Sequence, residues 1–158
     1  GLRDQGQALG PFEAWVVLVG METLSLRAER HVENTLHLAH WLLEQPQVAW
    51  VNYPGLPHHP HHDRAQKYFK GKPGAVLTFG LKGGYEAAKR FISRLKLISH
   101  LANVGDTRTL AIHPASTTHS QLSPEEQAQA GVSPEMVRLS VGLEHVEDLK
   151  AELKEALA

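Results

Sequence analysis

The sequence predicts an α/β domain of the α+β kind, a small, mostly antiparallel sheet covered by helices. Short segments rich in β-branched and aromatic residues, bounded by proline and glycine, alternate with longer segments of helical apolar spacing. The 158 residues suffice for one domain with a sizeable core. With 42% hydrophobic and 21% charged residues, the composition is that of a globular protein rather than a disordered one.

Composition also excludes several classes of function. A net charge of -1 and a pI near 6.9 argue against a nucleic-acid partner. The longest apolar run, Ala14 to Gly20, is far shorter than the roughly 20 residues of a membrane span. Because the chain has no cysteine, it has no disulfides, thiolate metal ligands or cysteine nucleophile, which fits a cytoplasmic protein.

The first third of the chain is predicted to be helical. Pro11 after Gly10 is a typical helix start, and apolar residues follow at helical spacing from Phe12 to about Glu44. Gly20 is expected to mark a break, so the segment forms two helices or one bent helix. The part before Gly20 is apolar on nearly all sides, which indicates that something else buries it.

The middle third alternates strands and helices. Val48 to Tyr53 is a predicted strand, stopped by Pro54 and Gly55, and a loop of prolines and histidines follows to about His62. A short helix is expected from Arg64 to Lys70, a second strand from Ala75 to Leu81, and an amphipathic helix from Tyr85 to Leu95.

The last third repeats this pattern. Short extended pieces are expected at Leu97–Ile98 and Leu110–Ile112. Ser123, followed by proline and two glutamates, is a good helix start. Val137 to Val141 is the last predicted strand, and a closing helix runs from Glu144 to Leu157.

The histidines at 58, 59, 61 and 62, with Asp63, are the most conspicuous local cluster. They are possible zinc or nickel ligands. A proline-broken loop, however, offers no rigid pair of ligands four residues apart on a helix. We therefore predict a solvated loop and no metal site.

Cofactor-holding residues are not evident. Lys82, Gly83 and Gly84 lack the spacing of a phosphate-binding loop and predict a strand-to-helix turn. Every lysine lies in a polar stretch or on a helix flank, whereas a Schiff-base lysine needs a desolvated pocket. We expect neither a catalytic nor a cofactor-binding residue in this chain.

Arg138 is the residue most suggestive of binding. Alternation along the strand places Arg138 and Ser140 opposite Val137, Leu139 and Val141. Arg138 is either an edge-strand arginine paired with a surface acid or a fork that grips a carboxylate. Spacing alone does not choose between them. Two polar segments, Ser99 to Asp106 and Pro114 to Ser120, are either binding loops or ordinary capping and turn sequences.

These same segments resemble a known family. The chain is similar, in order and over nearly its whole length, to the C-terminal part of the O-acetylhomoserine sulfhydrylases. These belong to the Cys/Met-metabolism group of pyridoxal-phosphate enzymes. The strand and turn from Val137 to Glu144, the loop from His113 to Ser120 and the turn at Pro54–Gly55 are shared by the whole group. Ser99 to Asp106 is typical of the sulfhydrylase branch. Further matching stretches are Arg3–Asp4, Gly10–Phe12, Gly20–Leu24, Arg30–Asn34, Val51–Pro57 and Lys82–Gly84.

The resemblance implies the C-terminal domain of a fold-type I enzyme dependent on pyridoxal 5'-phosphate (PLP). The reaction converts O-acetylhomoserine and sulfide to homocysteine and acetate, a step of methionine biosynthesis. It implies that Arg138 binds the substrate α-carboxylate and that Thr118 lies on the active-site loop. Ser99 or Asn103 assists at the carboxylate, with Asn103 slightly favoured.

The resemblance also implies how the chain is organised. Residues 1–44 are expected to be an interdomain linker and long helical segment, and residues 45–158 the substrate-binding domain. The large PLP-binding domain with the cofactor lysine is expected to be absent, so that this chain alone is inactive. A cytoplasmic homo-oligomer, a tetramer in the family, is implied, with no nucleic-acid or membrane partner. The alternatives are a cystathionine γ-synthase, a cystathionine lyase or a methionine γ-lyase, or a stand-alone, non-catalytic binding module.

Overall fold

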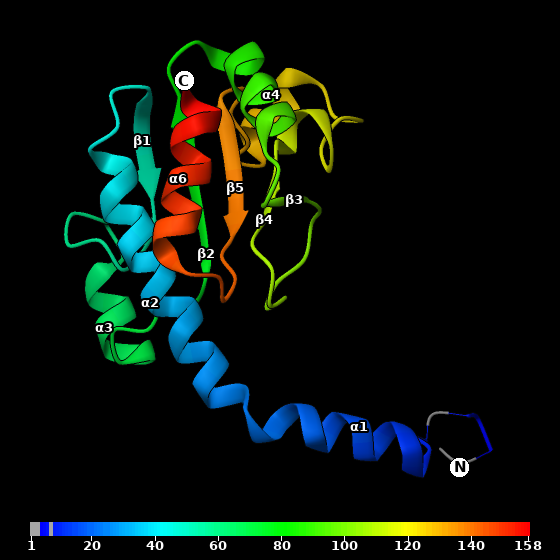
Figure 1. Cartoon of the computed structure of the whole chain (residues 1–158). Coiled ribbons are helices and arrows are strands. Elements are labelled where there is room, and N and C mark those ends of the chain that lie inside the picture. Colours follow the sequence, from blue (N-terminus) through cyan, green and yellow to red (C-terminus); the bar gives the residue numbers. More distant parts are fainter. Residues whose placement is uncertain (1–3, 7) are drawn as a thin grey trace.

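The computed structural model describes residues 4–6 and 8–158, so Arg3 of the first matching stretch lies outside the described residues. A five-stranded sheet runs through the domain in the order β1-β2-β5-β4-β3 (Figure 1). The strands are β1 (Val48–Asn52), β2 (Val76–Leu81), β3 (Ser99–His100), β4 (Leu110–Ile112) and β5 (Met136–Ser140). Only the pair β3 and β4 is parallel, which confirms the mostly antiparallel sheet.

Helices cover one face of this sheet. They are α2 (Leu24–Leu43), α4 (Gly84–Arg94) and α6 (Val146–Leu157), which lie side by side in front of the strands in Figure 1. Their apolar stripes, represented by Leu38, Phe91 and Leu149, pack on Phe79 of β2 and Leu139 of β5. Burying these stripes removes apolar surface from water, at about 25 cal/mol per Å², and this drives the packing.

Strand alternation explains which side chains reach the core. In β5, Val137, Leu139 and the following Val141 are almost completely buried among the helices, as predicted. Arg138 and its cross-strand partner Thr78 point to the opposite face. The helices of the core layer lie on the other face, and on this second face the histidine loop and the segment after β4 line hollows together with Thr78.

The N-terminal helices break three residues later than expected. α1 (Pro11–Glu22) runs through Gly20, and Thr23 is both the C-cap of α1 and the N-cap of α2. The Arg27 guanidinium donates a hydrogen bond of 2.6 Å to the Gly20 carbonyl and so satisfies an oxygen at the helix end. Gly20 tolerates the helix interior because a helical glycine costs only about 1 kcal/mol relative to alanine.

α1 projects away from the sheet and its helices (Figure 1). It has no buried residue, and its tryptophan, Trp15, is 58% exposed together with most of the apolar residues around it. α2 behaves differently, because its second half is part of the core. Residues up to 44 therefore include both an exposed helix and a helix that packs on the sheet. None of the helices within residues 4–6 and 8–158 combines the length and apolarity that a membrane crossing requires.

Shorter helices complete the chain. α3 (His62–Phe69) follows the histidine loop, and α5 (Pro124–Gln129) starts with a capping box between Ser123 and Glu126, as the sequence indicated. A 3-10 turn, η1 (Pro114–Ser116), was not predicted. Gly83 and Gly84 both have positive φ angles, which allows the abrupt turn from β2 into α4.

Candidate functional site

Arg138 lies on the central strand β5, between β2 and β4 rather than at an edge. Its direct partners across the ladders are Thr78 and Ile112. The half-buried side chain makes one hydrogen bond of 3.3 Å, from Nη2 to the main-chain oxygen of Asn103, and no ion pair with a described acid. The alternative of an edge arginine paired with a surface carboxylate is therefore not the arrangement in this structure.

A pocket of about 350 Å³ opens beside the Arg138 guanidinium. A cavity of this size suits a small molecule. Arg138 is the only lysine or arginine among its lining residues, and no lining residue is acidic. The pocket is lined by Thr78, Ala102, Ile112, Pro114, Thr118, His119, Ala130, Val132, Met136 and Arg138. A guanidinium without an acidic partner favours an anion, and its planar fork matches a carboxylate.

The buried side chain of His113 anchors the loop that carries Thr118. His113 is 1% exposed, and its Nε2 donates to the Pro134 carbonyl at 2.8 Å. Because a carbonyl can only accept, Nε2 carries the proton, and Nδ1 accepts from the Ser116 hydroxyl at 2.8 Å. The edge of the Tyr85 ring packs on the same imidazole, with ring centroids 4.8 Å apart. Thr118 itself is exposed on the pocket wall, and its hydroxyl bonds to His119 Nδ1 at 2.9 Å.

The two candidates from the other loop are placed differently. Asn103 reaches Arg138 only through its main-chain oxygen, because its side-chain oxygen accepts from the amide of Val104 at 2.8 Å. Ser99 lies on β3, separated from β5 by β4, and does not line the pocket. Arg138, Thr118 and the Asn103 main chain are therefore brought together, whereas Ser99 is not.

A buried network fixes the end of β5 and the start of β4. The Glu144 carboxylate accepts from the Thr109 amide and hydroxyl at 2.7 and 2.8 Å. The Thr109 hydroxyl oxygen in turn accepts from the Gly142 amide at 2.8 Å. A Cβ at Gly142 would lie 2.5 Å from the Arg108 carbonyl carbon, so this position needs glycine. The network holds the loop with Asn103 against the strand with Arg138.

Helix α2 also holds the segment that follows β5. Asn34 Nδ2 donates to the main-chain oxygens of Gly142 and Glu144 at 3.0 and 2.9 Å. His31 Nδ1 donates to the Val141 oxygen at 2.6 Å, and its buried Nε2 has no hydrogen-bond partner within residues 4–6 and 8–158. Sequence reasoning placed Arg30 to Asn34 in the resemblance but did not connect it with Arg138, since the contacts span about a hundred residues.

The histidine loop borders a second hollow, of about 500 Å³, on the same face of the sheet. Burial, followed by repulsion from His61, His58 and His62, lowers the pKa of His59. Within the described part of the chain, no three potential ligands gather in a way that could hold a metal ion. Thr78 lines both this hollow and the Arg138 pocket, so the two are adjacent.

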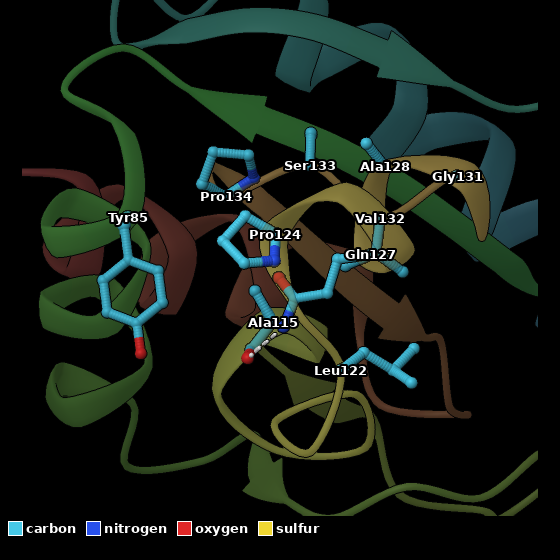
Figure 2. A pocket seen from close by; sticks show the side chains of 10 residues that line it. All are labelled: Tyr85, Ala115, Leu122, Pro124, Gln127, Ala128, Gly131, Val132, Ser133 and Pro134. Atoms are coloured by element: carbon cyan, nitrogen blue, oxygen red, sulfur yellow. Dashed lines mark hydrogen bonds between the residues drawn. The ribbon is translucent and has the colours of Figure 1, made fainter.

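A third hollow, larger than these two, is less suited to an anion. It measures about 580 Å³, and its lining contains no carboxylate, amine, guanidinium or imidazole. Figure 2 shows Tyr85 on one side and Leu122 on the other, with Gln127 between them. The Gln127 amide is already engaged, because Nε2 donates to the oxygens of Ala115 and His119 at 3.1 and 2.8 Å.

Comparison with known proteins identifies the family. The family model described as "Cys/Met metabolism PLP-dependent enzyme" matches residues 2–158. The chain belongs to this family.

Several similar proteins carry the name sulfhydrylase. The chain is 99% identical over 158 residues to O-acetyl-L-homoserine sulfhydrylase 1 of Thermus thermophilus and spans 38% of that protein. It is 54% identical to the O-acetyl-L-homoserine sulfhydrylase of Leptospira meyeri, of which it covers 36%. A crystal structure of a putative O-acetylhomoserine (thiol)-lyase from Campylobacter jejuni superposes with a TM-score of 0.89 at 44% identity. That match covers 99% of this chain and 37% of the other.

The family is PLP-dependent, and the Campylobacter structure contains a pyridoxyl-lysine phosphate. The described residues of this chain do not fit the role of holding that cofactor. No lysine lines the Arg138 pocket. Lys72, Lys96 and Lys150 are paired with glutamates, and Lys67 and Lys89 lie over tyrosine rings. The other lysines, at positions 70, 82 and 154, are exposed to solvent and so lack a desolvated setting. The pocket thus offers a guanidinium to an anion but has no lysine that could hold PLP covalently.

Proposed function

We propose that this chain is the substrate-carboxylate-binding part of a PLP-dependent O-acetylhomoserine sulfhydrylase. The reaction replaces the acetoxy group of O-acetylhomoserine with sulfide and gives homocysteine and acetate. The observation that carries the proposal is Arg138, a half-buried cation that pairs with none of the described acids and lines a pocket of about 350 Å³. The names of the relatives at 99% and 54% identity support the choice of substrate.

The residues of this chain would bind and orient the substrate. Arg138 would hold the α-carboxylate through parallel hydrogen bonds, and the Asn103 oxygen would fix one guanidinium nitrogen. Thr118 would contribute its hydroxyl to the wall of the same pocket. PLP supplies the electron sink for bond cleavage when it is bound elsewhere in the enzyme. Fixing the carboxylate restricts the orientations in which the γ-carbon meets sulfide.

The organisation of the chain supports the same proposal. We place residues 45–158 in the substrate-binding domain together with α2, which supplies core residues such as Leu38 to it, and we place only the exposed α1 in the connection to a further, PLP-binding domain. The exposed apolar surface of α1 supports burial by that domain or by another subunit of a homo-oligomer. A cytoplasmic location accords with the absence of cysteine and with the biosynthetic reaction.

The direct test is an assay of the complete protein with PLP and O-acetyl-L-homoserine. Sulfide should give homocysteine, and replacing sulfide with cysteine should give little cystathionine. A preference for cysteine, or rapid cleavage of cystathionine or methionine, would instead assign one of the related enzymes. No turnover with any of these substrates would leave a non-catalytic binding module as the better description and would overturn the proposal.

A further inference from the structure

The face of the sheet that bears Arg138 also carries a row of polar side chains. Thr78 on β2 is the direct partner of Arg138 on β5, and Asn52 on β1 is the direct partner of Thr78. Partners in neighbouring strands share a face, with Cα atoms roughly 4.5–5.5 Å apart. The row therefore leads in two steps from Arg138 to the histidine loop, where His59 Nε2 lies 2.7 Å from Asn52 Oδ1.

The hydrogen bonds in this row run in one direction. The His61 main-chain N–H lies 3.1 Å from His59 Nδ1, and because an amide N–H can only donate, Nδ1 is unprotonated. The proton of the neutral ring is then on Nε2, which donates to Asn52 Oδ1. This fixes the orientation of the Asn52 amide, whose Nδ2 donates to the Thr78 hydroxyl oxygen at 3.3 Å.

Thr78 is the end of this relay. Its oxygen accepts from Asn52, and none of the hydrogen bonds among the described residues uses its own proton. Thr78 lines the pocket that Arg138 lines, on the neighbouring strand. Each donor polarises the next in such a chain, so the final hydroxyl is a better donor than an isolated threonine.

We propose that the Thr78 hydroxyl, oriented by Asn52 and His59, is a second donor to the carboxylate that Arg138 binds. A carboxylate has about four acceptor sites, so the Arg138 fork leaves room for the Thr78 proton on one oxygen. The inference rests on the proposed function, which identifies the ligand as an amino acid. It also gives the histidine loop a role, since the loop starts the relay.

The state of His59 is compatible with this arrangement. Burial, with repulsion from the neighbouring histidines, lowers its pKa, which favours the neutral ring that the relay needs. The ionisable side chains around it are His58, His61 and His62, and no described carboxylate pairs with it. Because none of these neighbours is an acid, nothing in contact with the ring favours a second proton on it.

The test is made in the complete PLP-bound enzyme with Thr78→Val and Thr78→Ser. Binding of L-homoserine is measured by calorimetry, and kcat/KM is measured with O-acetyl-L-homoserine. Thr78→Val keeps the shape and removes the donor, so both quantities should weaken about ten- to a hundredfold, as for a lost hydrogen bond to a charge. Thr78→Ser should stay within a few-fold of the parent. If Thr78→Val binds as tightly as Thr78→Ser, the inference is wrong.

A second variant tests the relay itself. In Asn52→Asp the carboxylate still accepts from His59 but cannot donate to Thr78, whose proton it would capture. Asn52→Asp should therefore weaken binding about as much as Thr78→Val. The double variant should be no worse than Thr78→Val alone, because both changes remove one donor. If Asn52→Asp weakens binding as much in the Thr78→Val background as it does in the parent, its effect is charge repulsion with the ligand, and the relay is refuted.

Arg138→Ala separates this inference from the proposed function. If Arg138→Ala binds homoserine normally, the pocket is not the carboxylate site and the proposed function fails. If Arg138→Ala loses binding while Thr78→Val does not, only the relay fails. Thermal unfolding of each variant checks that the sheet is intact.

Discussion

Replacing Arg138 is the decisive perturbation for the proposed site. The guanidinium lies on a central strand, and one of its nitrogens is already held by the Asn103 oxygen at 3.3 Å. Its remaining N–H groups are thus preorganised toward a ligand. Removing one partner of such a charge-assisted pair costs about 2–5 kcal/mol, and the half-exposed position favours the lower part of that range. We expect Arg138→Ala to cost about 3 kcal/mol, or about 150-fold in kcat/KM.

Arg138→Lys keeps the charge but loses the fork, so we expect a loss of about 2 kcal/mol, or about 30-fold. The assay is homocysteine formation at varied O-acetyl-L-homoserine in the complete enzyme, together with PLP affinity, which should be unchanged. Arg64→Ala is the matched control, because Arg64 is an exposed arginine on α3, outside the pocket. The reasoning is refuted if both Arg138 variants remain within a few-fold of the parent, or if Arg64→Ala is equally impaired.

Four further predictions follow from particular contacts. Burial raises the pKa of Tyr53 to about 12, so the folded state favours the protonated phenol. Below the unfolded pKa of about 10, the contribution of Tyr53 to the free energy of unfolding is fully present. As the pH rises to about 12, the free energy of unfolding should fall by up to about 3 kcal/mol. Denaturant unfolding of Tyr53→Phe should not show this fall. Gly80→Ala should destabilise by about 1–3 kcal/mol because its Cβ would lie 2.2 Å from Trp50 Nε1. Gly20→Ala, with nothing within 4 Å, should stabilise α1 slightly, and equal melting temperatures would contradict both expectations. Calorimetry with zinc should give weak, ill-defined binding at the loop 58–62, whereas a tight one-to-one site would oppose this reasoning. The 158-residue chain mixed with PLP should form no homocysteine, since no lysine lines the Arg138 pocket, and turnover would disprove this.

Local signals predicted most of the secondary structure. Alternation identified β5 and its two faces, and the sequence from Ser123 predicted the capping box that starts α5. The helix break was wrong by three residues, because a glycine permits a break but does not require one. The strand expected at Leu97–Ile98 was wrong as well, since pairing with β4 shifts β3 to Ser99–His100. A two-residue strand depends on its partner more than on its own composition.

The sequence likewise indicated one part of the candidate site, and the tertiary structure decided the rest. Strand alternation singled out Arg138 but left two roles open, and the polar loop that contains Thr118 was open between a binding loop and a turn sequence. The resemblance to the family then pointed to Arg138 and Thr118 as site residues. That Arg138 occupies a central strand, beside Thr78 and the Asn103 oxygen, was decided by the tertiary structure. Alternation fixes which face of a strand a residue occupies, but neighbours across the sheet depend on strand order and register. Those are set by packing between segments up to about a hundred residues apart, and no local pattern in the sequence encodes them.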